Sequence, residues 1–226
     1  MADFNKTEQA AEMFKDKRKP KGEIKRLNTS LNEEQKAVKK CAYEYDVNII
    51  LGRQGSGKTL CATNIALDML FKGEVNQIIV CRPFDFKATG YLTGSLDEKL
   101  SYHMMPILHN FYQAYNKDKI DELYKEGKIL ILPIPYLRGI TFSKAVVVCD
   151  EIQEMDYENF ELVLSRLGKG SKILFTGSEE QNVLGDKSCI KKVMKLENSG
   201  LVCFHKLTTN HRNESIFSIF DYIKNN

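Results

Sequence analysis

Tryptophan is absent from the 226-residue sequence, and proline is rare, with five residues. No apolar run reaches the roughly 18 residues that a membrane-spanning helix needs. Residues 1–25 contain no apolar core of the kind that marks a secretory signal peptide. Neither sign of charge dominates, because 33 basic residues face 30 acidic ones and leave a net charge of +3. With 42% hydrophobic and 28% charged residues, the composition is that of an ordinary globular protein.

The cysteines also lack a recognisable pattern. No two of them form a C-x-x-C pair, which argues against a structural zinc site. Several fall within apolar strand or helix patterns. We therefore expect all six to be reduced and to act as small buried hydrophobic residues in a protein of a reducing compartment. The six are Cys41, Cys61, Cys81, Cys149, Cys189 and Cys203.

The N-terminal segment, residues 1–26, differs in composition from the rest of the chain. It is polar, it is interrupted by Pro20 and Gly22, and its basic residues outnumber its acidic ones between Lys15 and Arg26. Such a segment is either a solvated, flexible arm or a contact for nucleic acid, and we favour the solvated arm.

From Leu31 onward, apolar strand patterns alternate with helical ones, which predicts one α/β domain over residues 27–226. Strands rich in valine, isoleucine and leucine that alternate with helices are typical of a mainly parallel sheet covered by helices on both faces. We expect strands at 47–52, 76–83, 127–134, 144–151, 171–177 and 200–207, and helices at 32–45, 58–73, 95–115, 117–126, 156–168, 186–200 and 213–226.

The stretch GRQGSGKTL fits the pattern G-x-x-x-x-G-K-[ST] and lies between an expected strand and an expected helix, which is the context of a P-loop. Glycines let backbone N–H groups approach phosphate oxygens, Lys58 would reach the β- and γ-phosphates of ATP, and the Thr59 hydroxyl would bind Mg²⁺. The candidate phosphate-binding residues are Gly52, Arg53, Gln54, Gly55, Ser56, Gly57, Lys58, Thr59 and Leu60.

Two carboxylates follow the apolar run VVVC. Asp150 at the end of this expected strand would hold Mg²⁺, and Glu151 would orient or deprotonate the attacking water. After the next strand, Gln181 is a candidate sensor of the γ-phosphate. Arg212, after the last strand, is a candidate to stabilise charge on the transferring phosphoryl group.

With these residues placed, the chain resembles the PhoH family of P-loop ATPases, which are related to the motor core of superfamily-one helicases. The resemblance extends from about Leu31 to Ile223, and its most specific segments are GYLTGSLDEK and YLRGITF. It implies a single RecA-like P-loop NTPase domain. The arm lies outside it, and Gly177-Ser178 departs from the Gly-Asp that the family commonly has.

The resemblance also implies roles that residue patterns alone do not assign. Gln35 would contact adenine, although by itself it looks like a solvated helix residue. Gln153 would lie near the γ-phosphate, and Arg82 would couple ATP to nucleic acid. Arg138 would lie beside the active site or at a subunit interface.

Helicase cores of this type place ATP between two lobes, and the present chain has room for one. If Arg212 or Arg138 acts in trans, the protein must assemble, and the resemblance favours a hexameric ring around a single strand. The short arm, without an appended RNA-binding domain, suggests a minimal bacterial or phage version in the cytoplasm.

The sequence therefore predicts a Mg²⁺-dependent ATPase coupled to single-stranded nucleic acid, with RNA favoured over DNA. Tyr91, Tyr102 and Tyr136 could stack on bases, but we expect them to be packing residues. Two alternatives remain, namely a small-molecule kinase and a nucleotide-dependent interaction protein with little turnover. The sequence shows no arginine-rich lid of the kind such kinases have, and Glu151 argues against a protein without turnover.

Overall fold

The computed structural model describes residues 30–83, 96–211 and 222–223, and for residues 96–104 it describes the backbone alone. The basic arm, Tyr91, Arg212 and nearly all of the expected C-terminal helix therefore lie outside the described residues, as does the side chain of Tyr102.

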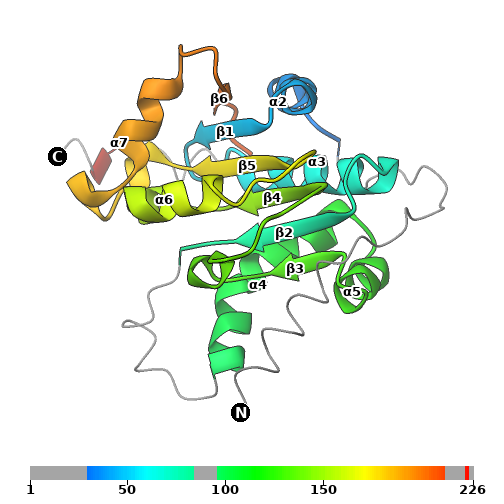
Figure 1. Ribbon diagram of the computed structural model, residues 1–226. Helices are drawn as coiled ribbons and strands as arrows, with labels where there is room; N and C mark the ends of the chain where they lie inside the picture. Colours follow the sequence, from blue (N-terminus) through cyan, green and yellow to red (C-terminus); the bar gives the residue numbers. More distant parts are fainter. Residues whose placement is uncertain (1–29, 84–95, 212–221, 224–226) are drawn as a thin grey trace.

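A single sheet of six parallel strands forms the centre of the molecule (Figure 1). The strand order is β3-β2-β4-β5-β1-β6, so the P-loop strand β1 lies between β5 and β6. This arrangement confirms the expected α/β class with a parallel sheet. The strands are β1 (Val47–Gly52), β2 (Gln77–Cys81), β3 (Ile129–Ile131), β4 (Ala145–Cys149), β5 (Lys172–Gly177) and β6 (Cys203–Leu207).

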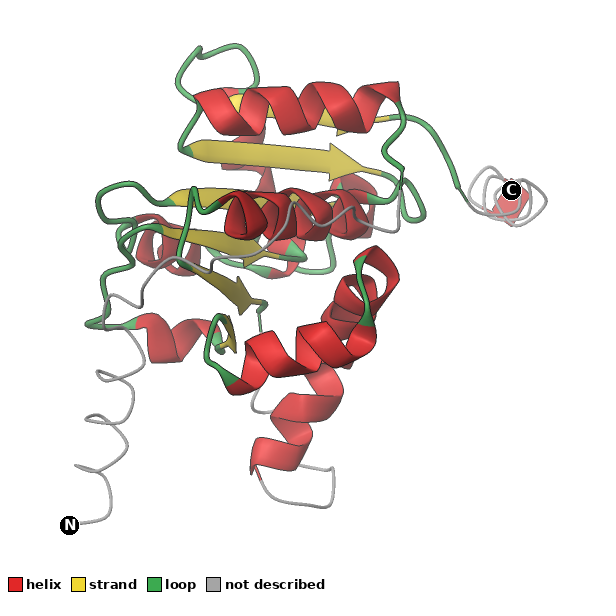
Figure 2. Cartoon of the chain, turned by 90° about the vertical axis from the view of Figure 1, so that its right-hand side faces the viewer, coloured by secondary structure: helices red, strands yellow, loops and turns green. Residues whose placement is uncertain are grey.

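Helices cover both faces of this sheet, as expected (Figures 1 and 2). One face carries α2 (Glu33–Glu44), α3 (Lys58–Lys72), α4 (Leu96–Ala114) and α5 (Lys117–Lys125). The other carries α6 (Tyr157–Leu164), α7 (Ile190–Val193) and the 3₁₀ turn η2 (Ile134–Leu137). Within the described residues, none of the helices is both long enough and apolar enough to cross a bilayer.

The continuous apolar runs of the strands supply both halves of the core. In β1, Ile50 packs into the cluster on the α3 side, whereas Ile49 and Leu51 pack into the cluster on the α6 side. Successive side chains of a strand point to opposite faces, so a strand buried on both faces is largely apolar.

The expected helix over residues 186–200 is wrong. The segment forms the 3₁₀ turns η5 (Gly185–Lys187) and η6 (Met194–Leu196) around the four-residue α7. Ser188 is extended and bridges to Asp156, and the Cys189 N–H donates to the Met155 carbonyl at 2.7 Å. Tertiary pairing therefore takes up the backbone groups that a continuous helix would need.

The expectation of six reduced cysteines is also wrong for two of them. Cys61, Cys81, Cys149 and Cys189 are buried and free, as expected. Cys41 of α2 and Cys203 of β6, however, form a disulfide across 162 residues of sequence, with their Cα atoms 5.9 Å apart. No local spacing could reveal this pair, because only the fold brings α2 onto β6.

Phe111 of α4 is fully buried in the apolar cluster on the α3 side of the sheet and provides a test of this core. We expect Phe111→Ala to lower the free energy of unfolding by about 3–5 kcal/mol, because a large cavity replaces the ring. Urea denaturation followed by far-UV circular dichroism measures the change. Tyr124→Ala on α5, where the ring is 49% exposed, is the matched control and should have little effect. Equal losses in both variants would contradict the packing described.

Candidate active site

The P-loop links the end of β1 to the start of α3. Gly55 and Gly57 adopt φ values of 87° and 78°, a left-handed conformation that residues with a Cβ atom rarely take. Gly57 is the N-cap of α3, so the positive end of the helix dipole opens onto the loop. The Lys58 ammonium is largely buried and donates a 2.8 Å hydrogen bond to the Arg53 carbonyl across the loop.

The other residues of the P-loop differ in their contacts and exposure. Arg53 forms a 2.7 Å ion pair with Glu180, which follows β5. Gln54 is exposed, and Leu60 packs at the edge of the apolar cluster beneath α3. The Ser56 hydroxyl is buried and has no hydrogen-bond partner among the described residues.

Asp150 lies directly after β4 and is 5% exposed. Its Oδ1 accepts a 3.0 Å hydrogen bond from the Thr59 hydroxyl and a short one from the Thr176 hydroxyl of β5. Burial, and then the neighbouring Glu151 charge, raise the pKa of Asp150, while the hydrogen bond from Thr176 opposes this rise. A carboxylate beside a P-loop hydroxyl is an oxygen donor set that suits Mg²⁺.

Glu151 occupies a left-handed backbone conformation, with φ 57°, immediately after Asp150. Both of its carboxylate oxygens are engaged. Oε2 accepts a 2.5 Å hydrogen bond from the Gln153 amide, and Oε1 lies 3.6 Å from the Arg82 guanidinium. The carboxylate is thus held between an amide and a cation at the carboxyl edge of the sheet.

Gln153 connects Glu151 to the turn that follows β5. It is 1% exposed, and its Oε1 accepts a 2.9 Å hydrogen bond from the Ser178 N–H. A Cβ atom on Gly177 would lie 2.8 Å from that oxygen, so a residue with a side chain at this position would displace the Gln153 amide. Ser178 thus contacts Gln153 through its backbone, and its own hydroxyl is buried without a partner among the described residues.

Gln35 lies against the P-loop, although it is distant from it in sequence. Its Nε2 is 2.8 Å from the position that a Cβ on Gly57 would take. Its Oε1 accepts the Asn32 N–H at 3.2 Å, while Asn32 in turn caps α2. Gln35 therefore helps to start the helix as well as bordering the loop, and contact with adenine stays a prediction.

The other predicted residues are less closely connected. Gln181 is half-buried in η4 (Glu179–Gln181), with its N–H 3.3 Å from the Ser178 carbonyl. Arg138 is exposed at the end of η2. Among the described residues, neither side chain forms a hydrogen bond to the P-loop or to Glu151, and the position of Arg212 is not described.

The segment after β6 is held over the P-loop by contacts that the sequence analysis missed. The Glu34 carboxylate accepts hydrogen bonds from the Thr208 hydroxyl and N–H and from the Thr209 N–H. The His211 N–H donates to the Gly55 carbonyl at 3.1 Å, and its ring lies 3.3 Å from the Asn32 amide. We call residues 208–211 the β6 clamp.

No local signal points to this clamp, because Glu34 and Thr208 are 174 residues apart in sequence. The sequence analysis also does not identify Thr176, although the sequence contains a pattern that could have indicated its role. A hydroxyl residue that ends an apolar strand just before Gly177 is placed to reach the carboxylate ending the neighbouring strand.

The Glu34 contacts should make stability pH-dependent. Hydrogen bonds from Thr208 and Thr209 lower the pKa of Glu34 from 4.5 to about 2 in the folded protein. Because the folded pKa is depressed, this stabilisation is complete above about pH 4.5 and is lost as the pH falls toward 2. We expect Glu34→Gln to be less stable than wild type at pH 7, with a difference that shrinks between pH 5 and pH 3. Urea denaturation at each pH measures it.

Glu33→Gln is the matched control, because Glu33 lies in the same helical turn and pairs with exposed Lys36 at the surface. A Glu34→Gln deficit that stays constant from pH 7 to pH 3 would show that the carboxylate does not act as described.

Comparison with known proteins places this arrangement in a family. The family model described as PhoH-like protein matches residues 28–221. A PhoH-like protein from Synechocystis sp. (strain ATCC 27184 / PCC 6803 / Kazusa) is 34% identical over 166 residues, covering 73% of this chain and 50% of the relative. One from Bacillus subtilis (strain 168) is 31% identical over 185 residues, covering 80% and 57%. The chain thus spans about half the length of these curated relatives.

Among solved structures, the large terminase from a thermophilic bacteriophage matches with a TM-score of 0.51 at 12% identity, covering 80% of this chain and 46% of that one. At this identity the match shows a shared fold. The Pif1 helicase from Candida albicans matches with a TM-score of 0.44 at 16% identity, covering 87% and 44%. The family match extends over most of the chain and shows that the chain belongs to the PhoH-like protein family.

Proposed function

We propose that this protein hydrolyses ATP with Mg²⁺ and couples the reaction to single-stranded nucleic acid, with RNA as the favoured strand. The observation that carries the proposal is the hydrogen bond from the Thr59 hydroxyl of the P-loop to Asp150, with the carboxylate of Glu151 next to Asp150 in sequence. Each has a chemical group suited to its role. Thr176 of β5 holds Asp150 in place, and Gln153 and Arg82 hold Glu151.

The residues that border the loop fit a nucleotide and its metal ion. Backbone N–H groups of the loop and Lys58 would bind the phosphates, and Thr59 and Asp150 would hold Mg²⁺. The ion, when bound, neutralises phosphate charge. Gln35 would lie on the adenine side, where it already borders Gly57.

Glu151 is the candidate to orient and deprotonate the attacking water. Gln153 and Arg82 hold its carboxylate from two sides, so its position depends on both. Gln181 would sense the γ-phosphate, and Arg212 would stabilise the charge that develops on it.

Arg82 offers a route from ATP to a nucleic-acid strand. It follows β2, reaches Glu151 with its guanidinium, and keeps a buried Nε that has no hydrogen-bond partner among the described residues. A backbone phosphate that attracted Arg82 would change the environment of Glu151. Tyr136 is 51% exposed, which does not fit the expectation of a packing residue and leaves its side chain accessible to a base.

Assembly into a ring, with a hexamer favoured, belongs to the same proposal. Arg138 is exposed at the end of η2, where a neighbouring subunit could use it. Either Arg138 or Arg212 would then complete the site of an adjacent protomer.

The direct test is steady-state phosphate release from ATP, with and without single-stranded RNA and DNA. We expect Glu151→Gln to reduce turnover by roughly 10²- to 10⁴-fold, as for loss of a general base, and Lys58→Ala to abolish it. RNA should stimulate the wild type several-fold and neither variant.

Turnover that ignores every strand would remove the nucleic-acid partner from the proposal. Transfer of phosphate to a metabolite would replace it with a kinase, and retained ADP with negligible phosphate release would replace it with a nucleotide-dependent interaction protein.

Thr176→Val tests whether Asp150 needs its second hydroxyl. Valine keeps the shape of threonine but removes the donor to Asp150 Oδ1, which should lower kcat/KM roughly tenfold, the size of one hydrogen bond to a charged acceptor. We also expect the half-saturating Mg²⁺ concentration to rise. Thr63→Val is the control, since that buried hydroxyl donates to the Thr59 carbonyl within α3. A Mg²⁺ titration of Thr176→Val that superimposes on wild type would contradict this role.

A further inference from the structure

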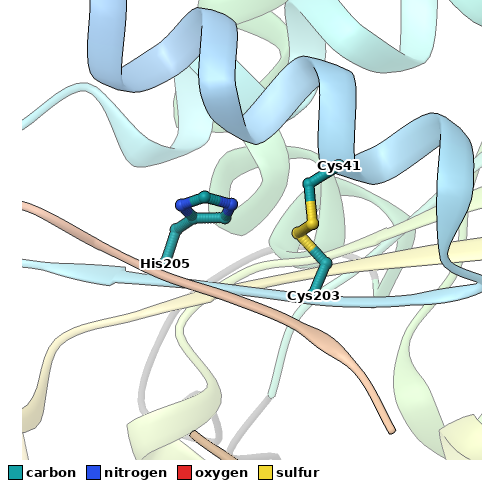
Figure 3. Close-up of side chains that lie close together, drawn as sticks. All are labelled: Cys41, Cys203 and His205. Atoms are coloured by element: carbon teal, nitrogen blue, oxygen red, sulfur yellow. A yellow bond between two sulfur atoms is a disulfide. The ribbon is translucent and has the colours of Figure 1, made fainter. Parts of the chain in front are cut away.

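Three side chains with soft or borderline metal-binding atoms meet where α2 crosses β6, away from the P-loop. Cys41 comes from α2, and Cys203 and His205 come from β6 (Figure 3). Residues two apart on a strand share one face, so Cys203 and His205 both face α2. The two sulfurs and an imidazole nitrogen lie within 4.8 Å of one another.

We propose that these three residues form a metal site that binds a soft or borderline divalent ion such as Zn²⁺ when the disulfide is reduced. Two thiolates and one imidazole are a donor set that zinc accepts, with water as the fourth ligand. The ion and the disulfide would be alternative links between α2 and β6. The proposal does not rest on ATP hydrolysis.

The geometry suits both links. A Cα–Cα distance of 5.9 Å lies within the usual range for a disulfide, and the same sulfurs can move apart to bind one ion between them. Cys203 is buried, whereas Cys41 and His205 are half-buried. An ion can therefore reach the cluster from solvent past Cys41 and His205.

A dithiol reductant breaks the S–S bond by transferring two electrons and two protons to the sulfurs, and is itself oxidised to a disulfide. The ion then replaces the two thiol protons, which leave to solvent. Oxidation of the site by a disulfide reagent would reverse both steps and release the ion.

This site escapes sequence patterns because its ligands come from positions 41, 203 and 205. The expectation against zinc rested on the absence of a C-x-x-C pair, which tests only for ligands that are close in sequence. Here, packing of α2 on β6 supplies the proximity.

The test is a Co²⁺ titration of the full chain without an affinity tag, reduced under anaerobic conditions with a phosphine, which lacks a competing thiol. We expect one Co²⁺ per chain to give thiolate charge-transfer bands in the near ultraviolet and tetrahedral ligand-field bands in the visible, both removed by Zn²⁺. The oxidised protein should give neither. Co²⁺ bound through oxygen at Asp150 would lack the thiolate bands, so the two sites are distinguishable.

His205→Ala is the decisive variant, because it keeps both thiols. We expect its Co²⁺ affinity to fall at least about tenfold, since even loss of a supporting residue behind a ligand has an effect of this size. Cys41→Ser and Cys203→Ser should lose the thiolate bands in part or whole. Cys61→Ala, which removes a buried cysteine outside the cluster, should titrate as wild type.

Reduced wild type without thiolate bands would overturn the proposal, as would a His205→Ala titration that matches wild type. Circular dichroism of each variant shows whether it is folded. If a serine variant fails to fold, His205→Ala still decides the outcome.

Discussion

One carboxylate oxygen, Oδ1 of Asp150, ties together the ends of three neighbouring strands. It accepts hydrogen bonds from Thr59, which follows β1 through the P-loop, and from Thr176 of β5, while Asp150 itself follows β4. Burying this charge is unfavourable, as the raised pKa of Asp150 indicates, and the two hydroxyls offset part of that cost. The P-loop and the two strand ends therefore cannot shift independently without leaving a buried carboxylate short of donors.

A second set of contacts joins the P-loop, α2 and the β6 clamp. Glu34 anchors the β6 clamp to α2, and the backbone of His211 reaches the carbonyl of Gly55. Since the Cys41–Cys203 disulfide joins the same two elements further along, α2 is attached to β6 at two points. The arrangement of α2 beside the P-loop thus depends in part on contacts between residues that lie near the two ends of the described chain.

The local sequence predicts much of the candidate site. The glycines and Lys58 specify the P-loop, and an apolar run that ends in Asp150 and Glu151 specifies a buried strand with carboxylates at its edge. Features that depend on long-range contacts were not predictable from local patterns. The cysteine pair, the Glu34 contacts and the short α7 all depend on tertiary partners, and in the case of Ser188 such a partner overrides helical propensity. Family resemblance predicts that Gln153 lies near the γ-phosphate, and only the fold shows that it connects Glu151 to Ser178.

The hydrogen bond from Lys58 to the Arg53 carbonyl has a consequence for affinity. The loop already supplies an acceptor for its own lysine, so a phosphate that bound there would exchange one partner of the Lys58 ammonium for another. The net gain in binding free energy would be the difference between a charged acceptor and a neutral one, and the released carbonyl would need a donor from water. Under the proposed function, discrimination between a triphosphate and weaker anions would then begin with this exchange of partners inside the loop.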